Sequence, residues 1–102
     1  MLVPKATLLV ALILFTSLAS AADELRGRSI AAACYGCHGP GAASGAAIPP
    51  ILQGAPKEYI MNILMAFRDG SRSGTIMNRI AKGYTDADIA AVAEHFSRQG
   101  GM

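Results

Sequence analysis

Two thiols and an imidazole occur together in the segment Cys34-Tyr35-Gly36-Cys37-His38, which has the pattern C-x-x-C-H. Thiols at this spacing can each add to one of the two vinyl groups of a single porphyrin, and this is the pattern at which haem is attached covalently to protein. The histidine that follows is then held under the iron as an axial ligand. Both cysteines of the chain lie in this motif. The motif therefore predicts one haem, tethered by Cys34 and Cys37 and ligated by His38.

A C-x-x-C pair also occurs in zinc sites and in redox disulfides. Zinc needs about four ligands, and outside the motif the chain has one histidine, His95, and no cysteine. A redox pair of the thioredoxin kind opens a helix in a βαβ unit, whereas this pair follows a predicted helix. The adjacent histidine favours haem, and a colourless protein would favour the disulfide.

The sixth position of the iron needs a ligand from elsewhere in the chain, and four methionines follow the motif: Met61, Met65, Met77 and Met102. Methionine on a helix, as predicted for Met61 and Met65, usually fills a core, and Met102 is terminal. Met77 lies in a predicted loop, where the backbone can bring its thioether to the iron, so it is the expected ligand. An iron with two protein ligands has no open site for a substrate, which favours electron transfer over catalysis.

Apolar residues recur at helical spacing in three segments. The first is 23–33, where Leu25, Ser29 and Ala32-Ala33 share one side and acidic residues occupy the first turn. The second runs from Pro56 to about Asp69, with Gly70 as its C-cap. Its apolar stripe comprises Tyr59, Ile60, Ile63, Leu64 and Phe67.

The third predicted helix begins after Thr85, which with Asp88 resembles a capping box. Its stripe comprises Ile89, Val92, Ala93 and Phe96, and Gly100-Gly101 ends it. His95 falls off this stripe and is expected to be an exposed residue, not a ligand. Segments 39–56 and 71–84 are rich in helix breakers and are predicted loops. The fold class is therefore all-α, with three to four short helices and long loops around one covalently bound haem.

Residues 1–21 have the organisation of a cleaved secretory signal peptide. Lys5 supplies the positive charge, Ala6 to Leu18 is almost wholly apolar, and Ala19-Ser20-Ala21 is a small-residue cleavage site. The alternative is an uncleaved membrane anchor, but the apolar run falls short of the ~20 residues that span a bilayer. We therefore expect a periplasmic protein whose single domain is 22–102, with no stable membrane insertion after cleavage.

A domain of this size buries little apolar surface and needs a staple. Since both cysteines are committed to the motif, a buried haem would be that staple, and the haem-free chain is expected to fold poorly. The formal net charge of +2 identifies no partner, and nothing resembles a face that binds nucleic acid.

From about Leu25 to Phe96 the chain resembles a class I c-type cytochrome. The resemblance implies that Gly27 packs against an aromatic residue of the last helix, here Phe96. It also implies that the carbonyl of Pro50 accepts a hydrogen bond from His38, and that Met77 is the axial methionine. Segment 74–86 is similar to the methionine loop of the cytochrome subunits of flavocytochrome c sulfide dehydrogenases.

This resemblance implies a non-enzymatic carrier of single electrons that accepts them from a flavoprotein sulfide dehydrogenase or another redox protein. A general carrier to a terminal oxidase is the first alternative. A gas sensor or enzyme with an open iron position is the second. The best-known sulfide dehydrogenase subunits carry two such domains, whereas this sequence has one haem motif, so it leaves open whether the chain is a bound subunit or a free carrier.

Overall fold

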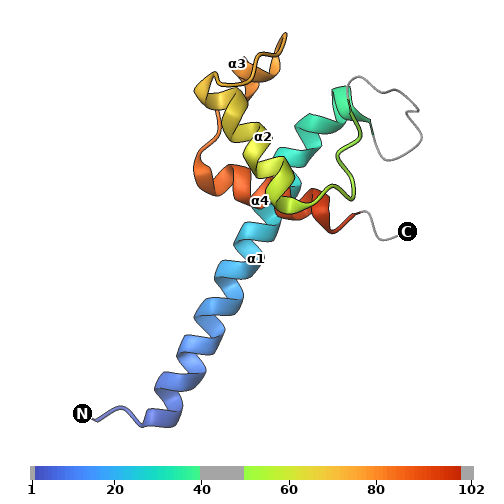
Figure 1. Ribbon diagram of the computed structural model, residues 1–102. Coiled ribbons are helices and arrows are strands. Elements are labelled where there is room, and N and C mark those ends of the chain that lie inside the picture. Colours follow the sequence, from blue (N-terminus) through green and yellow to red (C-terminus); the bar gives the residue numbers. More distant parts are fainter. Residues whose placement is uncertain (1, 40–49, 100–102) are drawn as a thin grey trace.

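The computed structural model describes residues 2–39 and 50–99, and within these ranges it is helical without strands (Figure 1). Its elements are α1 (Lys5–His38), α2 (Lys57–Asp69), α3 (Met77–Ala81) and α4 (Asp86–Ser97). The predicted all-α class is confirmed. The described parts of segment 39–56 contain no helix, as predicted, whereas segment 71–84, a predicted loop, contains α3.

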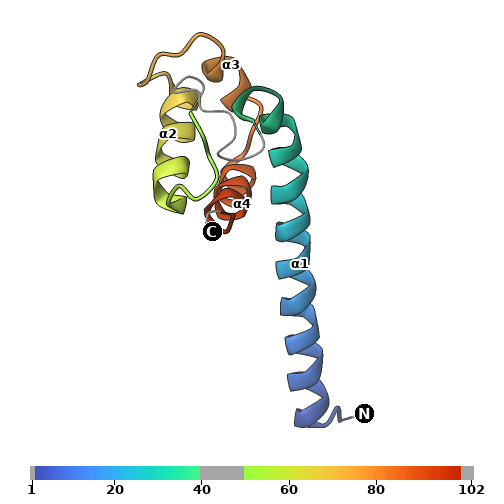
Figure 2. The ribbon, with the colours of Figure 1, turned by 90° about the vertical axis from the view of Figure 1, so that its right-hand side faces the viewer.

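Helix α1 is much longer than predicted. The expected start near Asp23 is wrong, because the helix runs without a break from Lys5 to His38. Its N-terminal half extends away from the other helices in both views (Figures 1 and 2). By length and composition α1 could cross a membrane, although the apolar run alone was predicted to be too short to span a bilayer. A signal sequence has the same length and composition. The apolar side chains along residues 8–18 are largely exposed, so this half needs removal, a lipid environment or a covering partner.

The side of α1 that packs on the domain differs from the predicted one. Gly27 and Ala31 are the buried residues of the helix, and Cys34 continues the same side one turn later. Leu25 is 60% exposed, and Ser29, Ala32 and Ala33 are exposed as well. The side that these residues share at helical spacing is therefore the exposed side of α1. Because this part of the helix is rich in alanine, its apolar pattern does not distinguish one side from another.

Helix α4 lies at the centre of the core and packs against both α1 and α2. Its predicted stripe is confirmed, since Ile89, Val92, Ala93 and Phe96 are all buried. The main cluster of buried residues comprises Ala31, Ile60, Val92, Ala93 and Phe96. On α2 the stripe is confirmed for Ile60, but Tyr59 is 58% exposed.

Gly27 lies where α1 crosses α4. A Cβ built on Gly27 would come 3.0 Å from the carbonyl carbon of Ala91, closer still to its oxygen, and 3.3 Å from Cβ of His95. Its nearest neighbours are therefore these two residues and not the expected Phe96. The Phe96 ring instead packs edge-on against Tyr35, with 5.6 Å between centroids. The glycine thus allows two helix backbones to approach closely.

Replacing Gly27 by alanine is expected to destabilise the haem-loaded protein by about 2 kcal/mol. Overpacking against a backbone carbonyl costs about 3 kcal/mol, and the gain in helix propensity returns only about 1 kcal/mol. The melting temperature should fall by about 10 °C. The matched control is Ala32→Gly on the exposed side, which should cost only the propensity of about 1 kcal/mol. Wild-type stability in the Gly27→Ala variant would contradict the close crossing.

Helix α4 begins with the predicted capping box. The Thr85 hydroxyl accepts a hydrogen bond from the Asp88 amide at 3.1 Å, and the Asp88 carboxylate accepts one from the Thr85 amide at 3.0 Å. The hydrogen bond from the Thr85 amide is the main reason that the pKa of Asp88 is lowered, and the charge of Arg26, 3.6 Å away, adds to the effect. The motif therefore satisfies two backbone amides and draws α1 towards the start of α4.

Acid should weaken this cap. Since the pKa of Asp88 is lower in the folded chain than in the unfolded chain, its contribution to stability is present above about pH 4. The contribution is lost as the pH falls through the folded pKa. We expect Asp88→Asn to melt below the wild type at neutral pH and the gap to narrow below about pH 4. Thermal melts of both proteins across this range measure the effect, and a gap that is constant with pH would exclude it.

Candidate haem site

The last turns of α1 carry the two thiols and the imidazole. Cys34 is half-buried and packs against the core cluster, Cys37 is exposed, and His38 is the final residue of the helix. Cys34 and Cys37 are three residues apart on a helix and so lie on the same side of it. Gly39 then adopts a φ of 74°, which lets the chain turn away directly after the histidine.

This placement does not suit a redox disulfide. Both cysteines are free, and they lie at the C-terminal end of α1, where the helix dipole disfavours a thiolate. Burial, and secondarily the charge of Cys37, raises the pKa of the Cys34 thiol. Residues 2–39 and 50–99 also contain no group of three or more histidine, cysteine or acidic side chains that could hold a metal ion. The described residues thus offer no closed zinc site.

The imidazole of His38 is oriented by the segment that follows the motif. Its Nδ1 lies 2.7 Å from the carbonyl oxygen of Pro50. A hydrogen bond donated from Nδ1 leaves the lone pair of Nε2 free for a metal. Nearby, the Gln53 amide donates to the carbonyl of Gly39 at 3.0 Å, and the Gly54 amide donates to the carbonyl of Phe96 at 2.9 Å. These bonds fix segment 50–54 between the motif and the end of α4.

Met77 is half-buried and is the first residue of α3. In both views α3 lies at the same end of the domain as the C-terminal end of α1, opposite the N-terminus (Figures 1 and 2). Burial, with smaller contributions from the charges of Cys34 and Asp88, raises the pKa of the Tyr84 phenol just beyond α3. The donors thus come from two elements that lie at the same end of the domain.

The donor set fits a covalently attached haem. Two thiols that form no disulfide lie on one side of a helix, and the imidazole has one nitrogen bonded to Pro50 and the other without a partner among the described residues. Leu52 and Leu64, like Cys34, pack against the core cluster and are only partly buried. Such residues have surface left for a porphyrin to cover.

The other candidate ligands lie elsewhere. Met61 packs against the core cluster, as expected of a filler, and Met65 is half-buried on α2. Met102 lies outside the described residues. The prediction that His95 is exposed is wrong. The side chain is half-buried, because it contacts the Phe96 ring and forms a hydrogen bond with Gln99 at 2.8 Å. The Tyr35 hydroxyl, 2.7 Å from the Gln99 side-chain oxygen and 3.3 Å from His95 Nε2, completes this cluster.

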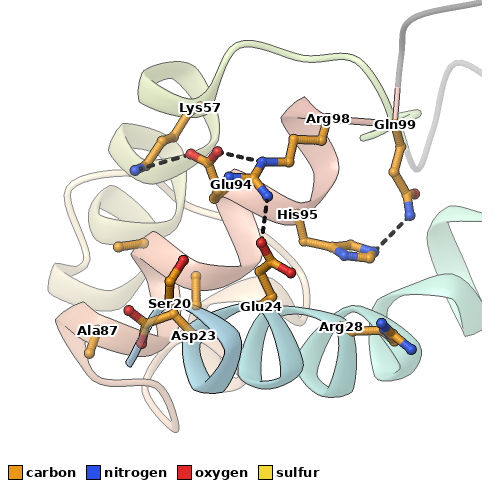
Figure 3. Close-up of a pocket in the computed structure, with 12 residues that line it drawn as sticks. Ser20, Asp23, Glu24, Arg28, Lys57, Ala87, Glu94, His95, Arg98 and Gln99 are labelled. Atoms are coloured by element: carbon orange, nitrogen blue, oxygen red, sulfur yellow. Dashed lines mark hydrogen bonds and ion pairs between the residues drawn. The ribbon is translucent and has the colours of Figure 1, made fainter. Parts of the chain in front are cut away.

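A polar groove lies between α1 and α4, and Cys34, Cys37 and His38 are not among the residues that line it (Figure 3). A chain of ion pairs crosses it, from Lys57 to Glu94 at 3.2 Å, from Glu94 to Arg98 at 2.7 Å and from Arg98 to Glu24 at 3.1 Å. Exposed pairs of this kind contribute little to stability, because water and salt screen their charges. The groove is therefore explained as a contact between three helices and not as a reaction site.

Sequence reasoning missed Asn78, whose side chain makes three hydrogen bonds to backbone groups beside Met77. Asparagine is common in turns because its amide bonds to nearby backbone. This preference could have marked Asn78 as a residue that binds nearby backbone, but it does not predict which backbone groups the side chain binds.

The sequence pattern of the Cytochrome c family matches residues 25–98. The chain is 45% identical over 73 residues to the cytochrome subunit of sulfide dehydrogenase of Chlorobaculum tepidum, covering 72% of this chain and 66% of that protein. It is 35% identical over 82 residues to cytochrome c-554(548) of Halomonas halodenitrificans, with coverage of 78% and 99%. It is 38% identical over 69 residues to the thiosulfate dehydrogenase electron acceptor of Thiomonas intermedia, covering 67% of this chain but 32% of that protein.

Proposed function

Since this chain belongs to the cytochrome c family and is an electron-transfer protein with a covalent haem c, we propose that it is an exported carrier that accepts single electrons from a flavoprotein sulfide dehydrogenase. The observation that carries this proposal is the 45% identity to a sulfide dehydrogenase cytochrome subunit. The chain spans just under two thirds of that relative, so its activity and partner are transferred here as part of the proposal.

Each site residue has a role in this proposal. Cys34 and Cys37 tether the porphyrin by thioether bonds, and His38 binds the iron through Nε2. The Pro50 carbonyl fixes the ring plane of His38 by accepting a hydrogen bond from its Nδ1–H group, which supports a stable ligand orientation. Met77 closes the sixth position. The bound haem supplies a centre that gains and loses one electron, and the protein keeps substrates away from it.

The partner is tested by reduction kinetics. The oxidised protein is mixed with the purified flavoprotein encoded in the same organism, and sulfide is then added. Rapid reduction that needs all three components, together with co-purification of the two proteins, is expected. No acceleration over sulfide alone, with no flavoprotein recovered, would remove the sulfide assignment and leave the electron carrier.

Thiosulfate oxidation is a second candidate, favoured by the similarity to thiosulfate dehydrogenase electron acceptors. The same assay distinguishes it, with a thiosulfate dehydrogenase and thiosulfate in place of the flavoprotein and sulfide. Reduction in neither assay, with rapid oxidation by a terminal oxidase, would favour a general carrier. Fast and tight binding of carbon monoxide to the reduced protein at neutral pH would favour a sensor or enzyme with an open iron.

Export rests on the N-terminal half of α1. We propose that the chain is cleaved after Ala21, so that the exposed apolar residues of the leader are removed from a periplasmic domain. This proposal is supported by the small residues at 19–21 and by the lack of buried positions in the apolar part of the helix. N-terminal sequencing of the purified protein tests it. A start near Ala22 is expected, and an intact Met1 would indicate a membrane anchor.

A further inference from the structure

The segment that carries Met77 has little regular structure to hold it. Helix α3 has five residues, and its N-cap, Ile76, makes no side-chain capping bond. Isolated helices of this length do not form in water. Among the described elements, α3 packs mainly on α2. The position of the Met77 thioether must therefore be fixed by specific contacts that connect this segment to α2.

The Asn78 side chain makes such contacts. Its Oδ1 accepts a hydrogen bond from the Gly74 amide at 2.7 Å, and its Nδ2 donates to the carbonyls of Phe67 at 2.9 Å and Arg72 at 2.7 Å. Both amide protons and one acceptor position are used. The reverse amide orientation would put Oδ1 against two carbonyls and Nδ2 against an amide proton, so the assignment follows from the network.

The three backbone groups connect the end of α2 to the start of α3. The Phe67 carbonyl is one of the last four of α2, which have no partner within the helix. Arg72 and Gly74 belong to the connection itself. A Cβ on Gly74 would lie 2.9 Å from the Phe67 ring and 3.6 Å from Cβ of Met77. The backbone at Gly74 therefore lies between the Phe67 ring and Met77, and its amide is one of the groups that Asn78 binds.

We propose that Asn78 is a positioning residue for the sixth iron ligand. By holding the carbonyls of Phe67 and Arg72 and the amide of Gly74 in one arrangement, it fixes the backbone at Met77 and keeps the sulfur at the iron. The inference rests on the proposed ligation by Met77. It concerns how firmly the sulfur is held, whichever redox partner the protein has.

The test replaces Asn78 by alanine in the haem-loaded protein. We expect the covalent haem and the Soret band to be retained, because the thioether bonds and His38 are unchanged. The weak near-red charge-transfer band of the iron–sulfur bond should fade. Imidazole, the external probe, should bind the oxidised protein at least about tenfold more tightly, as expected from losing three hydrogen bonds that hold the competing ligand.

Two further variants keep the test decisive. Asn78→Asp has the same size and retains the bond to Gly74, but it sets a carboxylate oxygen against two carbonyls, so it should behave like Asn78→Ala. Asn62→Ala is the matched control, because Asn62 is exposed on α2 and makes no side-chain hydrogen bond to another described residue. Wild-type imidazole affinity in folded Asn78→Ala and Asn78→Asp would overturn the proposal.

Thr85→Ala tests whether the effect of Asn78→Ala is only a loss of overall stability. It removes the N-cap of α4 and should lower the free energy of unfolding by roughly a tenth, while every residue of α3 is unchanged. If it tightens imidazole binding as much as Asn78→Ala does, the effect reflects lost stability and the proposal fails. Failure of the ligand assignment looks different. A near-red band that survives Met77→Ala would show that Met77 is not the ligand, whatever Asn78 does.

Discussion

Replacing Cys34 and Cys37 by serine is expected to give a colourless chain without a cooperative unfolding transition. Phe96 and Ile89 are the largest side chains that are fully buried in the described part of the protein, and the main cluster has five buried residues. Helices α2 and α4 have 13 and 12 residues, a length at which isolated helices are marginal in water. Without a porphyrin to cover the half-buried residues, the helical signal in circular dichroism should fall by about half or more.

The matched control is the single Cys37→Ser variant, in which one thioether and both iron ligands are kept. It should retain some colour and a cooperative melt, because the porphyrin still occupies the core. Mass spectrometry of each purified protein shows how much porphyrin is attached. A double variant that melts cooperatively without any porphyrin would show that the helices form a sufficient core alone.

The chemistry could be predicted from residue types and spacing, because covalent haem attachment depends on a local pattern. Helix α4 could be predicted too, since a capping box precedes a stripe of apolar residues that all lie on one side of the helix. The end of α2 at Gly70 followed from the same kind of local rule, and Gly70 has the φ of 87° that favours glycine. Each of these features is specified within about a dozen residues.

The features that were missed depend on contacts between distant residues. The packed side of α1 is set by the close approach of Gly27 to Ala91, which an alanine-rich sequence does not reveal. Helix α3 is too short to show a period, and it is held by Asn78 through groups up to 11 residues away. His95 is half-buried because Tyr35, 60 residues earlier, reaches it. Such pairings follow from the fold and not from local propensity.

Replacing Met77 by alanine is expected to abolish the near-red band and lower the reduction potential. Loss of the sulfur removes the ligand that favours the reduced iron. Because axial ligands set haem potentials over a range of about 0.8 V, a fall on the order of 100 mV or more is expected. Potentiometric titration and the absorption spectrum measure both changes. Reduced Met77→Ala should also bind carbon monoxide readily, since its sixth position is open.

The controls for this prediction are Met61→Leu and Met65→Leu, which remove the other methionine sulfur atoms of the described helices at nearly constant side-chain volume. Both should keep the band and the potential, because Met61 packs in the core and Met65 lies within α2. Loss of the band in Met65→Leu but not in Met77→Ala would reassign the ligand to α2. The iron would then be held by α1 and α2 alone, and α3 would be free to vary without changing the potential.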